Sequence, residues 1–171
     1  MPRLILYRHA KSDWSTPDLA DHDRGLAPRG VDAALRLAAW LDQSGFRPDR
    51  VLCSTALRTR LTLQPLLPLL SSDCDIQLTR EIYDLRDADY IELMRRKGGD
   101  ARCLMLIGHN PAMHDTAREL VIEGAAADLH ALGEKFPTAG LAVIDLPCAD
   151  FSGLVAQSGR LLHFIRPRDL V

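Results

Sequence analysis

The chain lacks any long run of apolar residues, and no stretch approaches the roughly 20 residues that a membrane-spanning helix needs. It also lacks an excess of basic residues, because 21 Lys and Arg stand against 23 Asp and Glu, for a net charge of −2. We therefore expect neither a nucleic acid nor a membrane as its partner. The start of the chain has no apolar segment with a cleavage site, so we expect no signal peptide.

Cysteine is scarce, and no two cysteines form a Cys-x-x-Cys pair. Two of the four, Cys53 and Cys103, lie in or beside apolar runs, where reduced and buried thiols are the usual state. This cysteine usage, together with the expected lack of a signal peptide, predicts a cytoplasmic protein with reduced thiols. The remaining two are Cys74 and Cys148.

The sequence also lacks the clustered ligands of a metal hydrolase. The six histidines form no His-Glu-x-x-His segment, and His109 and His114 are five residues apart, a spacing that does not place two ligands on one helical face. A metal hydrolase is therefore the less favoured enzyme class, and we expect neither a metal ion nor an organic cofactor. The other histidines are His9, His22, His130 and His163.

Apolar residues make up 47% of the 171 residues and charged residues 26%, which are ordinary values for a globular protein. Without repeats or linkers, we expect one domain over residues 1–171. Short apolar runs predict strands, and segments with a period of 3.6 residues or a proline start predict helices between them. This alternation predicts a three-layer α/β/α sandwich with a mainly parallel sheet and an antiparallel edge formed by the last two strands. The predicted strands are 3–7, 51–54, 76–78, 103–107, 141–146 and 160–165, and the predicted helices 28–44, 56–70, 89–97 and 111–121.

Cationic or imidazole side chains follow three of the predicted strands. Arg8 and His9 follow the first strand, Arg58 follows the second, and His109 follows the strand at 103–107. Because ligands bind beyond the carboxyl ends of parallel strands, we expect these four side chains to converge on one pocket. Two guanidinium groups and two imidazoles around one point are typical of a site for a phosphoryl group.

These segments resemble the signatures of the histidine phosphatase superfamily, which includes the phosphoglycerate mutases. Arg8-His9-Ala10 is similar to its Arg-His-Gly motif, the segment 54–62 to its second motif, and Gly108-His109-Asn110-Pro111 to its third. Within the superfamily the chain resembles the SixA-type phosphohistidine phosphatases. That likeness rests on residues 8–14, 21–24, 28–30, 136–138 and 166–170. The resemblance implies a phosphoglycerate mutase-like fold and a phosphatase that works through a phosphohistidine intermediate.

His9 is the candidate nucleophile. To attack phosphorus it must be neutral at the attacking nitrogen, with the other nitrogen held by a hydrogen bond, often to a backbone carbonyl. Nearby arginines favour the neutral form because they repel a second positive charge. Arg8 and Arg58 are expected to hold the phosphoryl oxygens, and His109 to donate a further hydrogen bond.

Three further residues have weaker assignments. Asn110 is interpreted either as a phosphate donor or as the cap of the helix that follows it. Ser15 occupies a position where relatives carry Asn, which implies a weak phosphate contact. Glu81 resembles the acid that protonates the leaving group in mutase-like relatives, although SixA-type proteins often lack a clear acid there. The rival acids in the loop are Asp13, Asp21 and Asp23.

The expected substrate is a phosphohistidine on another protein, such as a phosphotransfer domain in signal transduction. Imidazole is a weakly basic leaving group with a pKa near 6.5, so it needs little help from an acid, whereas an alkoxide needs much. Short loops after the predicted strands 103–107 and 141–146 leave room for no large cap, and a shallow, open site suits a protein surface or a broad range of small phosphates. The alternatives are a small-molecule phosphomonoester phosphatase of the same superfamily and a non-catalytic module that binds phosphate.

Overall fold

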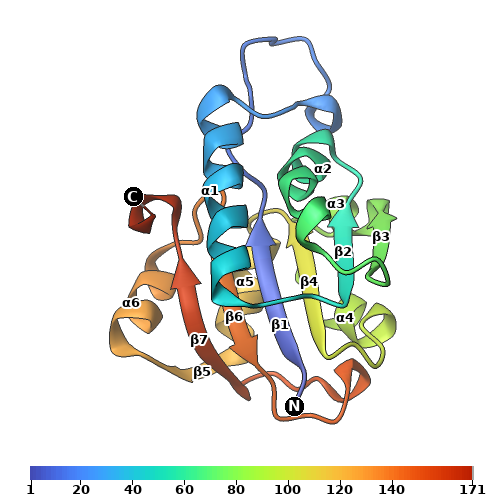
Figure 1. Cartoon of the computed structure of the whole chain (residues 1–171), viewed down its shortest axis with the longest axis vertical. Helices are drawn as coiled ribbons and strands as arrows, with labels where there is room; N and C mark the ends of the chain where they lie inside the picture. Colours follow the sequence, from blue (N-terminus) through green and yellow to red (C-terminus); the bar gives the residue numbers. More distant parts are fainter. Residues whose placement is uncertain (171) are drawn as a thin grey trace.

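The computed structural model describes residues 1–170 and contains seven strands in one sheet within that range. The order across the sheet is β3-β2-β4-β1-β6-β7-β5 (Figure 1). The strands are β1 (Arg3–Arg8), β2 (Arg50–Ser54), β3 (Asp75–Thr79), β4 (Cys103–Gly108), β5 (Val121–Gly124), β6 (Leu141–Asp145) and β7 (Gly159–Ile165). Neighbouring strands are parallel except that β6 runs against both β1 and β7.

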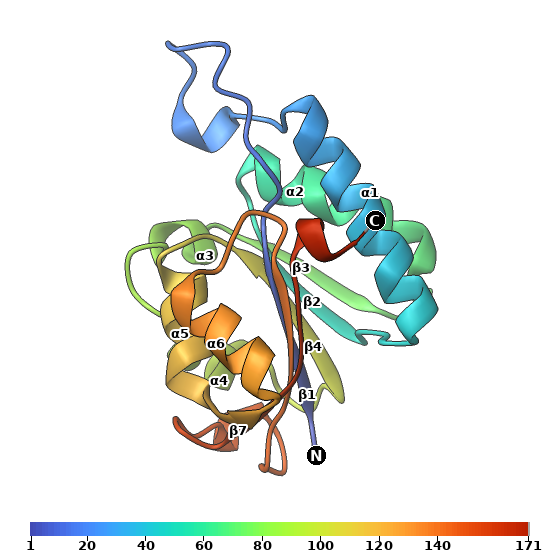
Figure 2. The same ribbon diagram turned by 90° about the vertical axis from the view of Figure 1, so that its left-hand side faces the viewer.

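Helices cover both faces of the sheet, which confirms the predicted three-layer architecture (Figure 2). One face carries α1 (Pro28–Ser44) and α2 (Leu57–Leu63). The other face carries α3 (Arg80–Asp84), α4 (Ile91–Lys97), α5 (Ala112–Leu120) and α6 (Ala126–Glu134). No helix within the described residues combines the length and apolar character needed to cross a membrane.

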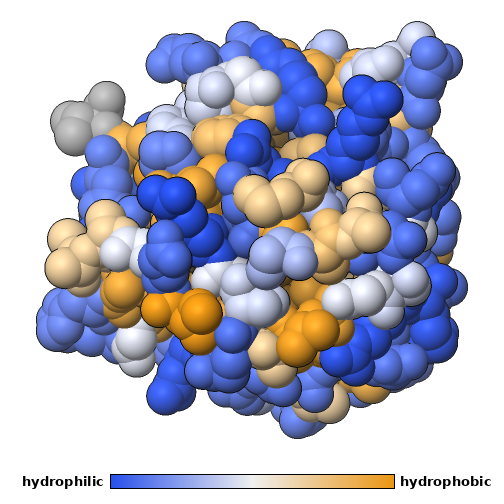
Figure 3. Space-filling view, turned by 90° about the horizontal axis from the view of Figure 1, so that it is seen from below, coloured by the Kyte–Doolittle hydropathy of each residue, from blue (hydrophilic) through white to orange (hydrophobic). Residues whose placement is uncertain are grey.

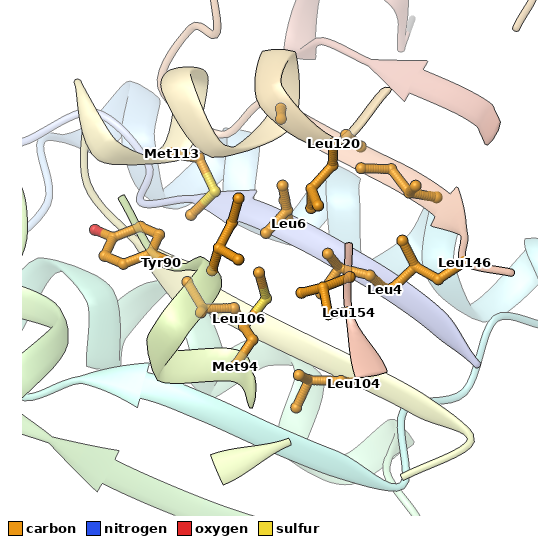
Figure 4. Packing of buried hydrophobic residues seen from close by; sticks show 14 of the residues in the cluster. Leu4, Leu6, Tyr90, Met94, Leu104, Leu106, Met113, Leu120, Leu146 and Leu154 are labelled. Carbon is orange, nitrogen blue, oxygen red and sulfur yellow. The ribbon is translucent and has the colours of Figure 1, made fainter. Parts of the chain in front are cut away.

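Side chains of the central strands alternate between the two faces of the sheet and pack into two hydrophobic cores, one on each face. Leu4 and Leu6 of β1 point toward α4 and α5, where they join Met94 and Met113 (Figure 4). Ile5 of β1 lies in the second core, beneath α1. Burial of whole strands on both faces explains why β1 and β4 read as unbroken apolar runs in the sequence.

Helix α1 begins and ends where the sequence predicts. Pro28 occupies its first turn, and Gly45 ends it in the left-handed conformation, with φ 75°. Gly30 packs so tightly beneath the chain after β1 that an added Cβ would collide with the carbonyl group of Lys11. This close approach fixes the path of the segment that follows His9. The period of 3.6 residues predicts a buried stripe of Val31, Ala34, Leu35, Ala38 and Leu41, but Val31 and Leu35 are exposed, at 47% and 55%.

Three local differences from the sequence-based expectation have simple causes. Helix α2 stops at Leu63 and continues as a 3-10 turn over Gln64–Leu69, because Pro65 and Pro68 interrupt the regular hydrogen bonding. The predicted helix end at Val121 is the start of β5, which pairs in parallel with β7. Since β7 and β5 lie beyond β6, the antiparallel pairing falls inside the sheet instead of at its edge.

A long excursion between β1 and α1 rises above the carboxyl ends of the parallel strands (Figures 1 and 2). It contains a 3-10 turn at Asp21–Asp23, and a bridge between Ser12 and Leu26 closes its base. We call residues 12–26 the overhanging loop. The opposite end of the molecule, seen in Figure 3, shows hydrophobic residues in small groups separated by hydrophilic ones.

Candidate active site

The carboxyl ends of β1, β2 and β4 bring the predicted residues to one edge of the sheet. Strand β4 lies between β1 and β2, and its register places Gly108 beside Arg8 and Ile107 beside Cys53. The backbone N–H of His9 donates to the carbonyl of Gly108 at 3.1 Å, which joins the two segments beyond the strands. The convergence that parallel strands predict is therefore present in the structure.

His9 is buried, with 7% of its surface exposed, and its ring is held in one tautomer. Nδ1 lies 2.8 Å from the carbonyl oxygen of Ala10. Because a carbonyl can only accept, Nδ1 carries the hydrogen and Nε2 keeps its lone pair. Burial lowers the pKa of His9 to about 3, with the charges of Arg58 and Arg8 acting in the same direction against the Ala10 hydrogen bond. The imidazole is therefore neutral at physiological pH, as a nitrogen nucleophile requires.

Arg58 is buried at 6% exposure and is held by the overhanging loop. Its Nη1 donates to the backbone carbonyl of Asp21 at 2.6 Å, and its Nη2 donates to the Asp21 carboxylate at 3.0 Å. Tyr83 donates its hydroxyl hydrogen to the same carboxylate oxygen at 2.9 Å. Burial opposes ionisation of Asp21, but the Tyr83 hydrogen bond and the Arg58 charge outweigh it and lower the pKa. Asp21 is therefore ionised, and its carboxylate contacts the same Arg58 guanidinium that the sequence predicts to bind the phosphoryl group.

His109 lies against His9, with ring centroids 5.3 Å apart. Its Nε2 is 2.8 Å from Ser54 Oγ, and its Nδ1 is 3.4 Å from Nη2 of Arg58. Burial, with His9 and Arg58 acting in the same direction, lowers the pKa of His109 to about 2. Since Arg58 can only donate, Nδ1 accepts and Nε2–H donates to Ser54 in this arrangement. In this tautomer Nδ1 of His109 orients Arg58. His109 can donate a hydrogen bond from Nδ1 to phosphate only in the other tautomer, in which Nδ1 carries the hydrogen.

One backbone carbonyl group holds the side chains of both Arg8 and Asn110. Arg8 Nη1 and Asn110 Nδ2 both donate to the carbonyl of Phe136, at 2.9 and 2.8 Å. Nε of Arg8 is buried and has no hydrogen-bond partner among the described residues. The capping interpretation of Asn110 is wrong, because Pro111 caps α5 and no side chain bonds to its first turn.

A cavity of about 270 Å³ opens above His9. The side chains that line it are those of Arg8, His9, Lys11, Ser12, Trp14, Asp21, Arg58 and Thr138. The segment that follows His9 contributes Lys11, Ser12 and Trp14, and the segment 136–138 contributes Thr138. In the sequence, only the resemblance of these segments to SixA-type proteins pointed to a place at the site. A groove of about 280 Å³ between α1 and α2 is lined almost entirely by apolar residues and offers no group for phosphate chemistry.

Four predicted site residues do not line this cavity: His109, which contacts Arg58, Asn110, which donates to the Phe136 carbonyl, and also Ser15 and Glu81. Ser15 is exposed, and its backbone N–H donates to the Asp13 carboxylate at 2.8 Å, so the serine of this loop that lines the cavity is Ser12. Glu81 forms an ion pair with Arg96 of α4 and does not line the cavity. Because that pairing depends on how α3 and α4 pack, the sequence offered no sign of it. Of the acids considered for proton transfer, Asp21 is the one that lines the cavity.

The described part of the chain holds no candidate metal centre. Within residues 1–170, no three or more His, Cys, Asp or Glu side chains are grouped as ligands for a metal ion. The four cysteines carry free thiols, with Cys53 and Cys103 buried as predicted.

Comparisons with known proteins agree with this geometry. The model of the histidine phosphatase superfamily (branch 1) matches residues 4–97. An uncharacterized protein of Mycobacterium tuberculosis, strain H37Rv, is 39% identical over 140 residues, which cover 80% of this chain and 85% of the relative. The crystal structure of the proposed phosphohistidine phosphatase SixA from Agrobacterium tumefaciens is similar with a TM-score of 0.79 at 35% identity, covering 98% of this chain and 99% of that one. A proposed SixA phosphohistidine phosphatase from Nakamurella multipartitia has a TM-score of 0.75 at 26% identity, covering 97% and 96%.

Proposed function

The chain belongs to the histidine phosphatase superfamily and is a phosphatase, and from this premise we propose that it hydrolyses phosphohistidine on a protein. In this proposal residues 1–171 act as one phosphatase domain, and the phosphoryl group passes through His9. The observation that carries the proposal is the state of that imidazole. It is neutral, its Nδ1 is tied to Ala10, and it lines the same cavity as Arg8 and Arg58.

The reaction proceeds in two displacements. In the first, Nε2 of His9 attacks phosphorus and the bond from phosphorus to the leaving nitrogen breaks. Its electron pair returns to the substrate ring, which departs as neutral imidazole because its other nitrogen carries a hydrogen. Arg8 and Arg58 hold the oxygens over which charge spreads. In the second, water attacks phosphorus, the bond to Nε2 breaks, and inorganic phosphate leaves. Asp21, ionised at the wall of the cavity, accepts the proton that the water releases.

The position of the acids favours an N–P bond in the substrate. Glu81 is held by Arg96 away from the cavity, and Asp21 is ionised, so neither presents a proton to a basic leaving group. An alkoxide leaving from a phosphate ester needs such a proton. A phosphohistidine ring that already carries a hydrogen on its other nitrogen departs as neutral imidazole, with its pKa near 6.5, without one. The two similar solved structures are of proteins proposed to be phosphohistidine phosphatases, which supports the same substrate class.

A second candidate is a phosphatase of small phosphomonoesters. The cavity volume of about 270 Å³ is enough for a phosphate with a compact leaving group, which is the observation in its favour. The two candidates differ in leaving group, so the ranking of substrates separates them.

The decisive experiment measures phosphate release from a histidine-phosphorylated phosphotransfer protein and from a panel of small phosphate esters. We expect the larger kcat/KM for the phosphohistidine protein, and an acid-labile phosphate on the enzyme that the His9→Ala variant does not acquire. The His9→Ala variant should lose at least about a thousandfold in turnover, as removal of a nucleophile does.

His114→Ala is the matched control, because that imidazole bonds the Leu132 carbonyl at 2.6 Å, away from the cavity. Undiminished hydrolysis by His9→Ala would refute the nucleophile. A higher kcat/KM for small esters would replace the proposed substrate with the second candidate, and phosphate binding with no turnover of any substrate would indicate a binding module.

A further inference from the structure

Trp14 stands at the mouth of the catalytic cavity. Within residues 1–170 it is the one aromatic residue among the large hydrophobic residues that are exposed, with 60% of its surface accessible. It lines the same cavity as His9 and Arg58. An exposed indole is costly to leave in water, and tryptophan is enriched at contact sites because its large rigid surface loses little entropy on binding. The proposed two-step reaction makes no use of the Trp14 side chain.

The indole is fixed in place although it is exposed. The guanidinium of Arg24 lies 4.2 Å from the centroid of its ring, as in a cation–π contact. Arg24 is buried, and it donates to the carbonyls of Thr16 and Pro17 at 2.9 and 3.3 Å. The ring is therefore ordered before any ligand arrives, which reduces the entropy cost of contacting one.

Hydrogen bonds at the base of the overhanging loop hold this assembly over the site. The backbone N–H of Asp13 donates to Gly25, and that of Ala27 donates to Lys11, each at 2.9 Å. The excursion is visible above the strand ends in Figures 1 and 2. Trp14 lines the cavity, whereas Arg24 does not.

The direction of the displacement decides which part of a substrate reaches Trp14. Phosphoryl transfer places the attacking and leaving atoms in line on opposite sides of phosphorus. With Nε2 of His9 attacking from the buried floor, the leaving group points outward to the mouth of the cavity, where Trp14 lies.

We propose that Trp14 is a specificity-determining residue whose indole packs against the imidazole ring of the substrate phosphohistidine. This inference rests on the proposed function and deepens it, because it assigns recognition of the leaving group to one side chain. Aromatic rings attract each other in offset or edge-to-face arrangements, and an imidazole offers such a ring whereas an alkyl phosphate does not.

The test compares two substrates that share the N–P bond and differ in the ring. Phosphohistidine carries an imidazole on the nitrogen, and phosphoramidate carries hydrogen atoms only. We expect Trp14→Ala to lower the ratio of kcat/KM for phosphohistidine over that for phosphoramidate by about tenfold, the fold-change that one aromatic contact supplies. Trp14→Phe should restore most of the ratio. Leu19→Ala, another exposed residue of the same loop that does not line the cavity, should leave the ratio unchanged.

A binding measurement gives an independent readout. The chain has two tryptophans, so a His9→Ala/Trp40→Phe variant leaves Trp14 as the single indole and cannot turn the substrate over. Phosphohistidine should change the fluorescence of Trp14 at concentrations where phosphoramidate does not. Equal fluorescence changes, or an unchanged kcat/KM ratio in Trp14→Ala, would overturn the inference while the phosphatase stands. A wild-type protein that fails to hydrolyse phosphohistidine but cleaves small esters would overturn both the inference and the proposed substrate.

Discussion

The guanidinium of Arg58 donates to Asp21 twice, to its backbone carbonyl at 2.6 Å and to its carboxylate at 3.0 Å. The carbonyl bond orients the guanidinium, and the carboxylate occupies a donor that a phosphoryl oxygen would use. Tyr83 holds the carboxylate in this position through its hydroxyl group. An oxyanion that enters the cavity must therefore compete with a negative charge that the protein supplies itself.

Asp21→Asn should tighten inhibition by vanadate and inorganic phosphate while it slows turnover. The amide keeps the shape of the side chain but removes the competing charge, so we expect the inhibition constants to fall about fivefold. Turnover should decrease because the variant lacks the proton acceptor of the second displacement. Asp23→Asn is the control, since that carboxylate lies next to His22 at 3.6 Å and does not line the cavity. Weaker inhibition of Asp21→Asn would show that the carboxylate positions Arg58 and does not compete with the oxyanion.

Arg58→Ala should weaken inhibition by vanadate roughly 100-fold to 1,000-fold, the loss expected for one preorganised donor in a buried site. The measurement is the inhibition constant against a small phosphate substrate. Arg60→Ala is the matched control, because Arg60 is on the same helix, is exposed, and donates to the carbonyl of Thr55. Because Arg58→Ala leaves the Asp21 carboxylate without its partner, Arg58→Ala/Asp21→Asn should be compared with it. Inhibition of both variants at the wild-type level would remove Arg58 from the phosphate site.

Stability should fall as the solution becomes acidic, because two imidazoles are buried in the neutral form. Burial lowers the pKa of His9 to about 3 and that of His109 to about 2, from a usual value of 6.5. The unfolded chain takes up protons at these residues first, so their stabilising contribution is complete above pH 6.5 and is lost as the pH falls toward 3. Denaturant midpoints measured from pH 7.5 to pH 4.5 should therefore decrease.

A matched pair of variants separates this effect from general acid denaturation. His9→Gln should show a shallower decline of the unfolding free energy with falling pH, because one of the two buried imidazoles is gone. His130→Gln should follow the wild type, since the His130 side chain is 78% exposed. Parallel curves for wild type and His9→Gln would contradict the assignment of the pH dependence to His9.

The sheet and its layers could be predicted because strands that are buried on both faces appear in the sequence as continuous apolar runs. The runs in β1 and β4 are buried on both faces and contain no polar residue between Leu4 and Tyr7 or between Cys103 and Ile107. The short edge strand β5 was missed because two of its four residues, Glu123 and Gly124, are polar or small and its burial is slight. Val31 and Leu35 were wrongly placed in the core, since a period of 3.6 residues fixes the spacing of a buried face but not its direction.

By itself, the sequence determined the fold class and placed Arg8, His9, Arg58 and His109 at or beyond the carboxyl ends of parallel strands. Apolar runs mark the buried strands, and the alternation of strands with helices makes neighbouring strands parallel. Only the tertiary structure decided which polar groups meet there. Folding brings the Asp21 carboxylate into contact with Arg58 and places Trp14 at the mouth of the cavity. It also pairs Glu81 with Arg96 outside the cavity. These contacts join segments far apart in the chain, and the attraction between two charges depends on a distance that packing alone fixes.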